Sequence, residues 1–392
     1  MPLAILSLAG VSFLISWIVT GLMKRLAPRW GFVDRPGGRK IHSNPKPLGG
    51  GVAILLGFAL PVAIGLIIVA THPASPAPPH DPDARRLAAY WSGARERAPM
   101  MAGVLAAALL MHLLGLWDDR KALGPYLKLI CQFAIIVGMV TLFDVRAVLD
   151  KLGMGRSASI ILSIIWIVAI TNAFNFLDNM DGLSAGVAAV CTAAFLVASI
   201  SIEQWFVAAG LSLLFGALVG FLCFNFAPAS IFMGDSGSLV VGFLLGVLTV
   251  RGTYLPENER FGAGWYAVFA PLIVLAVPLY DLVVVSTIRM VRGRSPFVGD
   301  TNHFSHRLVA RGMSRRTAVL CLYLITAATA VAAIILPHLQ SPLLAKLIFL
   351  QTWLILGVVA LLEQHPLPTP SKSSDSATAA ESKAPADLVS TP

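Results

Sequence analysis

Two pairs of closely spaced carboxylates stand out in an otherwise apolar sequence. Asp118 and Asp119 are adjacent. Asp178 and Asp181 are three residues apart, and Asn175 precedes Asp178 by about one helical turn, so in a helix these side chains share a face. Neighbouring carboxylates repel each other unless a cation or a phosphate-bearing partner is near, so each pair predicts a divalent metal site or a carboxylate suited to general-base chemistry. The structural alternatives are a solvated turn for the first pair and helix caps for the second.

A fifth carboxylate belongs to the stretch "FMGDSGSL". Asp235 stands directly before Ser236, at the start of a short apolar run. Ser and Asp at such a position often only cap a helix, but a helix amino end also attracts anions, and Asp235 could hold a metal that bridges to one. Hard oxygen ligands favour Mg²⁺, with Mn²⁺ as the alternative. Glycines in this stretch and in the run "GGG" at residues 49–51 predict close backbone approach to a helix or a ligand.

Basic side chains that can bind phosphate accompany the carboxylates. The candidates are Lys40, Lys128, His303, His306 and Arg307. Arginine and lysine in such loops can serve membrane topology alone, whereas histidines three residues apart can contact phosphate or move a proton near neutral pH. The sequence has no HExxH motif or Cys/His cluster for zinc and no GxxxxGK[ST] motif for ATP.

These residues must be positioned by membrane-spanning helices. The chain of 392 residues is 57% hydrophobic and only 12% charged, and its apolar runs lack the alternation of a lipid-facing β-barrel. We expect an all-α polytopic bundle of about eleven spans, or ten if the short eighth is a half-helix. The predicted spans are 3–23, 48–71, 99–117, 126–143, 157–176, 184–201, 205–226, 237–250, 265–287, 317–337 and 343–362.

The distribution of charge predicts the orientation of the bundle. The first and ninth loops carry seven Lys or Arg each, although the second loop also contains Arg85, Arg86, Arg95 and Arg97. The positive-inside rule therefore places the odd-numbered loops in the cytoplasm, with the N-terminus outside and the C-terminus inside. All the polar stretches above fall in odd-numbered loops, which predicts one site on the cytoplasmic face. The net charge of +9 fits anionic lipid and substrate and does not require a nucleic-acid partner.

The motifs together resemble those of the polyprenyl-phosphate N-acetylhexosamine-1-phosphate transferases. "GLWDDRKALGPYLKL", "NAFNFLDNMDGLSAG" and "FMGDSGSLVVGFLLG" are similar to three ordered motifs of that family, and the resemblance covers residues 1–362. It implies Mg²⁺-dependent transfer of a sugar-1-phosphate from a UDP-N-acetylhexosamine to undecaprenyl or decaprenyl phosphate, with release of UMP, as the first membrane step of a cell-envelope polysaccharide pathway. We expect an enzyme of the inner membrane, with residues 363–392 as a disordered cytoplasmic tail and a homodimer as one form of assembly.

The resemblance also implies roles for individual residues. The candidate catalytic residues are Asp118, Asp119, Asp178 and His306; the candidate substrate-binding residues are Lys40, Lys128, Asn175, Asp181, His303 and Arg307; the candidate metal ligands are Asp235 and Asp118. Direct attack by the lipid phosphate and a covalent aspartyl intermediate are both compatible with the sequence.

One position departs from the pattern of the family. Ser305 stands where the related motif H-x-H-H-R-L has its middle histidine. We expect N-acetylglucosamine as the donor sugar, with N-acetylgalactosamine or an N-acetylated deoxysugar as alternatives. Phospho-N-acetylmuramoyl-pentapeptide transferase is a more distant alternative, because its HHHFE pattern is absent. A secondary transporter would carry charges within its spans and an internal repeat, and a catalytically inactive scaffold is the remaining alternative.

Overall fold

The computed structural model describes residues 1–34, 45–72, 82–146, 155–252, 268–295, 303–339 and 341–364. In these ranges nine helices are long and apolar enough to cross a membrane. They are α1 (Pro2–Arg29), α2 (Gly50–Thr71), α3 (Pro82–Arg120), α4 (Pro125–Leu142), α5 (Arg156–Leu177), α6 (Leu183–Ser201), α7 (Trp205–Asn225), α12 (Arg315–Ile335) and α13 (Pro342–Gln364). The prediction of an all-α, multi-pass membrane protein is confirmed.

The two remaining predicted spans are shorter or interrupted. α8 (Asp235–Arg251) has 17 residues and is therefore roughly 25 Å long, slightly less than the hydrocarbon thickness of a bilayer. The predicted span 265–287 is divided at Leu275 into α9 (Ala270–Val274) and α10 (Ala276–Val291). α11 (Phe304–Ala310) and the 3₁₀ turn η3 (Leu336–His338) are short connections.

α8 is a continuous helix at the centre of the bundle and not a half-helix. Every residue from Ser236 to Val250 is buried. α8 runs antiparallel to α5: the Asn175 amide donates to Ser238 Oγ near one end (2.9 Å), and the Trp166 indole donates to Thr249 Oγ1 near the other (2.9 Å). Between these contacts a Cβ on Gly242 would lie 2.7 Å from Thr171 Cα, so the two backbones pack closely, as small residues allow in membranes.

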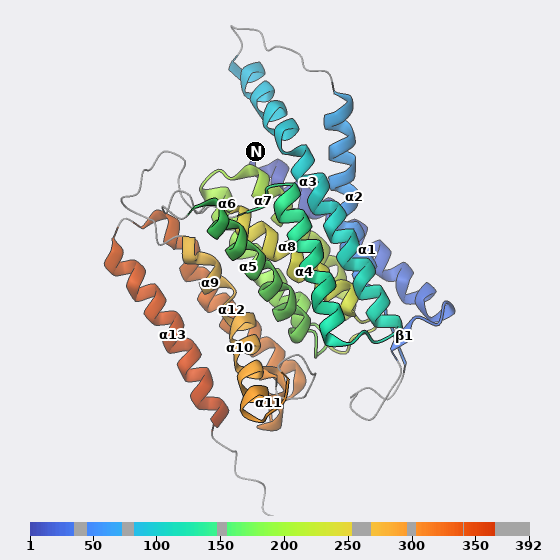
Figure 1. Ribbon diagram of the computed structural model, residues 1–392, viewed down its shortest axis with the longest axis vertical. Helices are drawn as coiled ribbons and strands as arrows, with labels where there is room; N and C mark the ends of the chain where they lie inside the picture. The colour runs from blue at the N-terminus through green and yellow to red at the C-terminus, as the bar shows by residue number, and fades with distance from the viewer. Residues whose placement is uncertain are drawn as a thin grey trace, which may run out of the picture.

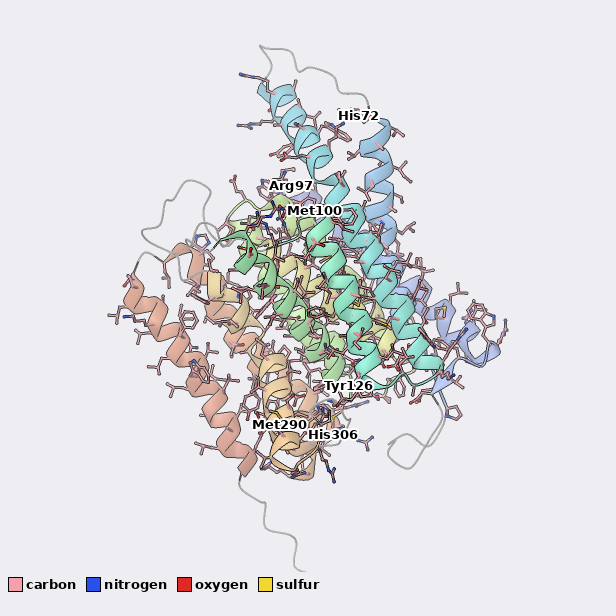
Figure 2. All side chains as sticks on the ribbon, viewed as in Figure 1. His72, Arg97, Met100, Tyr126, Met290 and His306 are labelled. Atoms are coloured by element: carbon pink, nitrogen blue, oxygen red, sulfur yellow. The ribbon has the colours of Figure 1, made fainter. Side chains whose placement is uncertain are left out.

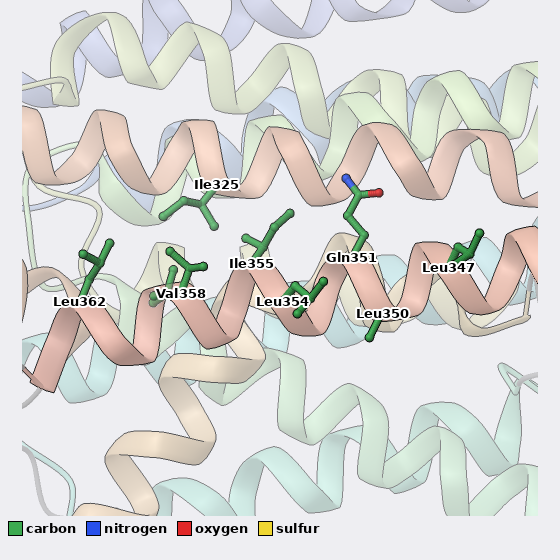
Figure 3. Close-up of a pocket in the computed structure, with 9 residues that line it drawn as sticks. Ile325, Leu347, Leu350, Gln351, Leu354, Ile355, Val358 and Leu362 are labelled. Carbon is green, nitrogen blue, oxygen red and sulfur yellow. The ribbon is translucent and has the colours of Figure 1, made fainter.

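The outer helices differ from the predicted spans mainly at their ends. α3 has 39 residues and begins 17 residues before the predicted boundary at 99, so that α2 and α3 extend together beyond the rest of the bundle (Figure 1). α13 lies at the far edge (Figure 1), with an apolar groove between it and Ile325 of α12 (Figure 3). A two-stranded antiparallel sheet, β1 (Val33–Asp34) with β2 (Lys46–Pro47), leads into α2.

Candidate active site

The candidate site is built on the amino end of α8, which the backbones of α2 and α3 approach closely at glycines. The Gly51 N–H donates to the Met233 carbonyl oxygen (3.1 Å), and a Cβ on Gly51 would meet Gly237 N at 2.4 Å. The predicted close approach of the glycine run is confirmed, and its partner is a helix. On the other side, the buried His112 of α3 donates from Nδ1 to the Ser236 carbonyl oxygen (3.0 Å).

Gly115 of α3 provides a direct test of this packing. A Cβ on Gly115 would lie 2.4 Å from both the nitrogen and the Cα of Ser236, so Gly115→Ala must push α3 away from α8. We expect the variant to lose about 1–3 kcal/mol of stability and to lower activity strongly, because Asp119 moves with α3. Gly138→Ala on α4 is the matched control, since a Cβ there meets nothing within 4 Å. Equal melting temperatures and equal rates for the two variants would contradict this account.

Asp119 caps the amino end of α8. Its Oδ1 accepts from the Asp235 N–H (2.8 Å) and its Oδ2 from the Ser236 N–H (3.1 Å). Gly234 permits the approach: its φ is +70°, and a Cβ there would lie 2.7 Å from Asp119 Oδ2. A carboxylate at a helix amino end is favoured by the two N–H groups and by the helix dipole. Both oxygens of Asp119 are thus used in holding the start of α8 in place.

Asp118 belongs to a different network, centred on Lys128. The Lys128 ammonium lies 2.9 Å from Asp118 Oδ2 and 2.7 Å from Asp235 Oδ2, and it also donates to Asn175 Oδ1 (3.2 Å). The Asn175 amide in turn donates to Asp235 Oδ1 (2.6 Å). The side chains of Lys128 and Asp118 are only 13% and 10% exposed, whereas that of Asp235 is 32% exposed. The charge-assisted network is therefore shielded from water on the Asp118 side and accessible at Asp235. Four helices, α3, α4, α5 and α8, each contribute one of these residues.

Asp178 and Asp181 follow α5 and differ from each other. Desolvation raises the pKa of Asp178 well above its usual range, and the carboxylates of Asp235, Asp119 and Asp181 raise it further against the opposing effect of Lys128. The environment of Asp178 therefore disfavours negative charge and favours a cation. Asp181 Oδ2 accepts the Ala229 N–H (2.8 Å), which ties this loop to the one that precedes α8.

The donor set fits a divalent cation that is shared with a substrate. Among the described residues no three His, Cys, Asp or Glu side chains converge closely enough to hold a metal ion by themselves. Asp118 Oδ2 and Asp235 Oδ2 nevertheless lie on either side of one cation, the Lys128 ammonium. Mg²⁺ is commonly held by one or two carboxylates together with substrate phosphates, which is the arrangement that these two oxygens could supply.

A second polar group from α10 and α11 lies at the end of α5. His303 Nδ1 donates to Asp281 Oδ2 (2.9 Å), and the Phe304 N–H donates to Asp281 Oδ1 (2.7 Å). The His303 ring is edge-on to the ring of Phe176, with centroids 5.7 Å apart, and Phe176 follows Asn175 directly. The Arg289 guanidinium lies 4.9 Å from the centroid of the Phe176 ring. Phe176 thus connects this group with the Lys128 network.

Sequence reasoning missed Asp281 and Arg289, which are both almost completely buried. A signal for Asp281 was present, since an aspartate inside the apolar run 265–287 is costly unless it is paired. For Arg289 the sequence shows only one of seven basic residues in a loop, and nothing in it separates a buried arginine from exposed ones.

Asp281→Asn tests whether Asp281 acts by positioning His303. The amide would present N–H groups to one of the two donors that the carboxylate now accepts, so the His303 ring should lose its fixed orientation. We expect activity to fall by about 10- to 100-fold, the range seen for residues that orient functional histidines. In a double-mutant cycle, Asp281→Asn should have little further effect in a His303→Ala background. Fully multiplicative losses would show that Asp281 acts independently of His303.

The other predicted residues lie near Asp281 and His303, except for Lys40, which is outside the residues that the structure describes. The buried Ser305 hydroxyl donates to Asn179 Oδ1 (2.6 Å), so the residue that departs from the family pattern connects α11 to the Asp178 loop. Arg307 pairs with Glu363 of α13 (3.0 Å). Figure 2 places His306 at the same end of the bundle as Tyr126, near the start of α4. Lys40 lies outside the described residues, and its predicted role stays a prediction.

Comparisons with known proteins identify the family that the chain belongs to. Residues 101–253 match the model of glycosyl transferase family 4. The chain is 33% identical over 344 residues to decaprenyl-phosphate N-acetylglucosaminephosphotransferase of Mycolicibacterium smegmatis, with 82% of this chain and 80% of the relative covered. It is 30% identical, with 83% of each chain covered, to a Bacillus subtilis protein named "probable undecaprenyl-phosphate N-acetylglucosaminyl 1-phosphate transferase". The undecaprenyl-phosphate alpha-N-acetylglucosaminyl 1-phosphate transferase of Escherichia coli K12 is 26% identical, with 82% of this chain and 80% of the relative covered.

Proposed function

The chain belongs to glycosyl transferase family 4, and on that premise we propose that it transfers N-acetylglucosamine-1-phosphate from UDP-N-acetylglucosamine to undecaprenyl or decaprenyl phosphate. The observation that carries the proposal is the network in which Asp118 and Asp235 share the Lys128 ammonium at the end of the bundle. Carboxylates, a cation between them and basic residues nearby are the groups that phosphoryl transfer requires. The lipid acceptor explains why such a site is built on membrane-spanning helices.

In the proposed reaction an oxygen of the lipid phosphate forms a bond to the sugar-linked phosphorus of the donor. The bond from that phosphorus to the oxygen shared with UMP breaks, and UMP leaves with the electron pair. Where the lipid phosphate carries a proton, the base in this proposal is Asp118, whose Oδ2 contacts the Lys128 ammonium and whose Oδ1 accepts from the Leu123 N–H, whereas both Asp119 oxygens hold the start of α8. Mg²⁺, held by Asp118 and Asp235, would neutralise charge on the diphosphate.

The remaining candidates take positions around the donor in this proposal. Asn175, Asp178 and Asp181 order the nucleotide side, and His303, His306 and Arg307 contact phosphate or sugar. We place the site on the cytoplasmic face of the inner membrane, where a nucleotide sugar is supplied, and all of the chemistry within residues 1–362.

Release of UMP by the purified chain tests the proposal. The chain would be given undecaprenyl phosphate, Mg²⁺ and, in parallel, UDP-N-acetylglucosamine or UDP-N-acetylgalactosamine. We expect UMP to appear with the first donor, to stop on addition of EDTA and to resume with excess Mg²⁺ or Mn²⁺. Absence of UMP with every UDP-N-acetylhexosamine would refute the transferase, and preference for another donor would refute only the sugar. Activity unaffected by EDTA would refute the metal.

A further inference from the structure

Four arginines gather at the end of the bundle opposite the candidate site. They are Arg97, Arg146, Arg156 and Arg251. α3 and α5 each have their last residues at the candidate site, and α4 and α8 each begin there. At the opposite end, Arg146 follows α4, Arg156 begins α5 and Arg251 ends α8, while Arg97 lies within α3, close enough for its charge to act on Arg251. Figure 2 shows Arg97 at one end of the bundle and His306 at the other.

The cluster has more positive than negative charge among the described residues. Asp144 Oδ1 accepts from Arg146 Nε (2.9 Å) and from Arg156 Nη2 (3.3 Å). The charges of Arg97 and Arg146 act unfavourably on Arg251, and only that of Asp144 acts favourably on it within the described part of the chain. Within the described residues, Asp144 is thus the carboxylate that offsets the charge of Arg251, and it is shared with Arg146 and Arg156.

Arg251 is the last residue of α8, and the longer helix α5 continues past it. Because Thr249 of α8 is level with Trp166 of α5, Arg251 lies about two helical turns below the first residue of α5. Its Nε atom is buried and has no hydrogen-bond partner among the described residues. The Arg146 side chain is only 16% exposed. Desolvated guanidinium groups with like charges nearby are unfavourable unless an anion offsets them.

An aromatic ring of α7 contacts one arginine of the cluster. The Arg97 guanidinium lies 5.9 Å from the centroid of the Phe206 ring at the start of α7, a cation–π contact. By the charge of the loops this end of the bundle is the one outside the cytoplasm, where the positive-inside rule disfavours arginine. Arg97 of α3, Arg146 after α4, Arg156 of α5 and Arg251 of α8 nevertheless meet at this end.

We propose that this arginine cluster binds a phosphate group, and that the phosphate belongs to the headgroup of an anionic lipid in the leaflet opposite the candidate site. Guanidinium groups bind phosphate through paired N–H bonds, so a phosphate oxygen would supply the acceptor that Arg251 Nε lacks. The cluster stands where apolar helices reach the edge of the hydrocarbon region, which is the depth of a lipid phosphate. The lipid would join α3, α5 and α8 at the end that the candidate site does not hold together.

Thermal melting of the purified chain in neutral detergent tests the proposal. Phosphatidylglycerol, phosphatidylcholine and inorganic phosphate would be titrated separately, with chloride to match ionic strength. We expect the melting temperature to rise with phosphatidylglycerol and not with the other two. Arg251→Gln should need about tenfold more phosphatidylglycerol for half of the full shift, because a charge-assisted contact to the phosphate is lost. UMP release should be retained in this variant.

Arg86→Gln is the matched control, since it removes the same charge from an exposed position on α3. It should respond to phosphatidylglycerol as the unmodified chain does. If Arg251→Gln does not fold, Arg97→Gln replaces it and should show the same tenfold loss. An equal lipid response in the cluster variants and in Arg86→Gln would overturn the proposal. A shift with inorganic phosphate and none with phosphatidylglycerol would overturn the lipid as the source of the phosphate.

Discussion

Asp235→Asn is expected to lower kcat for UMP release by about 10³-fold, with little change in the fold. Asparagine has the shape of aspartate and can still accept the Asn175 amide, which now donates to Asp235 Oδ1 (2.6 Å). It cannot hold a divalent cation with the strength of a carboxylate. The measurements are kcat and the Mg²⁺ concentration that gives half of the maximal rate, and we expect the latter to rise as well.

The matched control for this variant is Asp83→Asn, the same chemical change at the exposed start of α3, far from the candidate site. It should leave kcat and the Mg²⁺ requirement unchanged. If Asp235→Asn kept its rate and its Mg²⁺ dependence, Asp235 would not be a metal ligand. If it lost its rate but kept the Mg²⁺ dependence, the carboxylate would act on Lys128 and not on the metal.

The helices could be predicted from the sequence because spans in a bilayer are set mainly by the length of apolar runs. The exceptions have local causes. α3 begins 17 residues before its predicted start at 99. This added segment is polar and Arg-rich, and no rule of bilayer thickness applies to it. The run 265–287 is apolar on both sides of Leu275, so hydropathy does not indicate the division there.

The residues of the site could be predicted better than their contacts. Polar stretches at the ends of spans identified Asp118, Asp119 and Asp235, and their place in odd-numbered loops predicted that they lie on one face of the membrane. Loop numbering does not fix how each helix is rotated or shifted along its axis, and this decides which side chains meet. The close contacts at Gly51 and Gly115 set that shift for α2 and α3. They leave Asp119 on the amino end of α8 and Asp118 on Lys128, two different environments that adjacent positions in a sequence cannot distinguish.

Lys128→Met is expected to have the largest effect on stability, and an effect that Mg²⁺ reverses. The ammonium is the cation between Asp118 Oδ2 (2.9 Å) and Asp235 Oδ2 (2.7 Å). Its removal leaves two carboxylates facing each other, and breaking a buried ion pair typically destabilises a protein by about 3–5 kcal/mol. We expect a markedly lower melting temperature in EDTA, and UMP release reduced by about 100-fold.

The response of Lys128→Met to metal distinguishes a lysine that only stabilises the fold from one that occupies a cation site. If the two carboxylate oxygens form such a site, Mg²⁺ should replace the missing ammonium and raise the melting temperature of Lys128→Met much more than that of the unmodified chain. Lys121→Met removes the same charge from an exposed position between α3 and α4 and should melt like the unmodified chain with and without Mg²⁺. A Lys128→Met variant that is destabilised and insensitive to Mg²⁺ would separate the lysine from the metal site. The proposed metal ligands would then have to be sought nearer to Asp178, where the surrounding carboxylates already favour a cation.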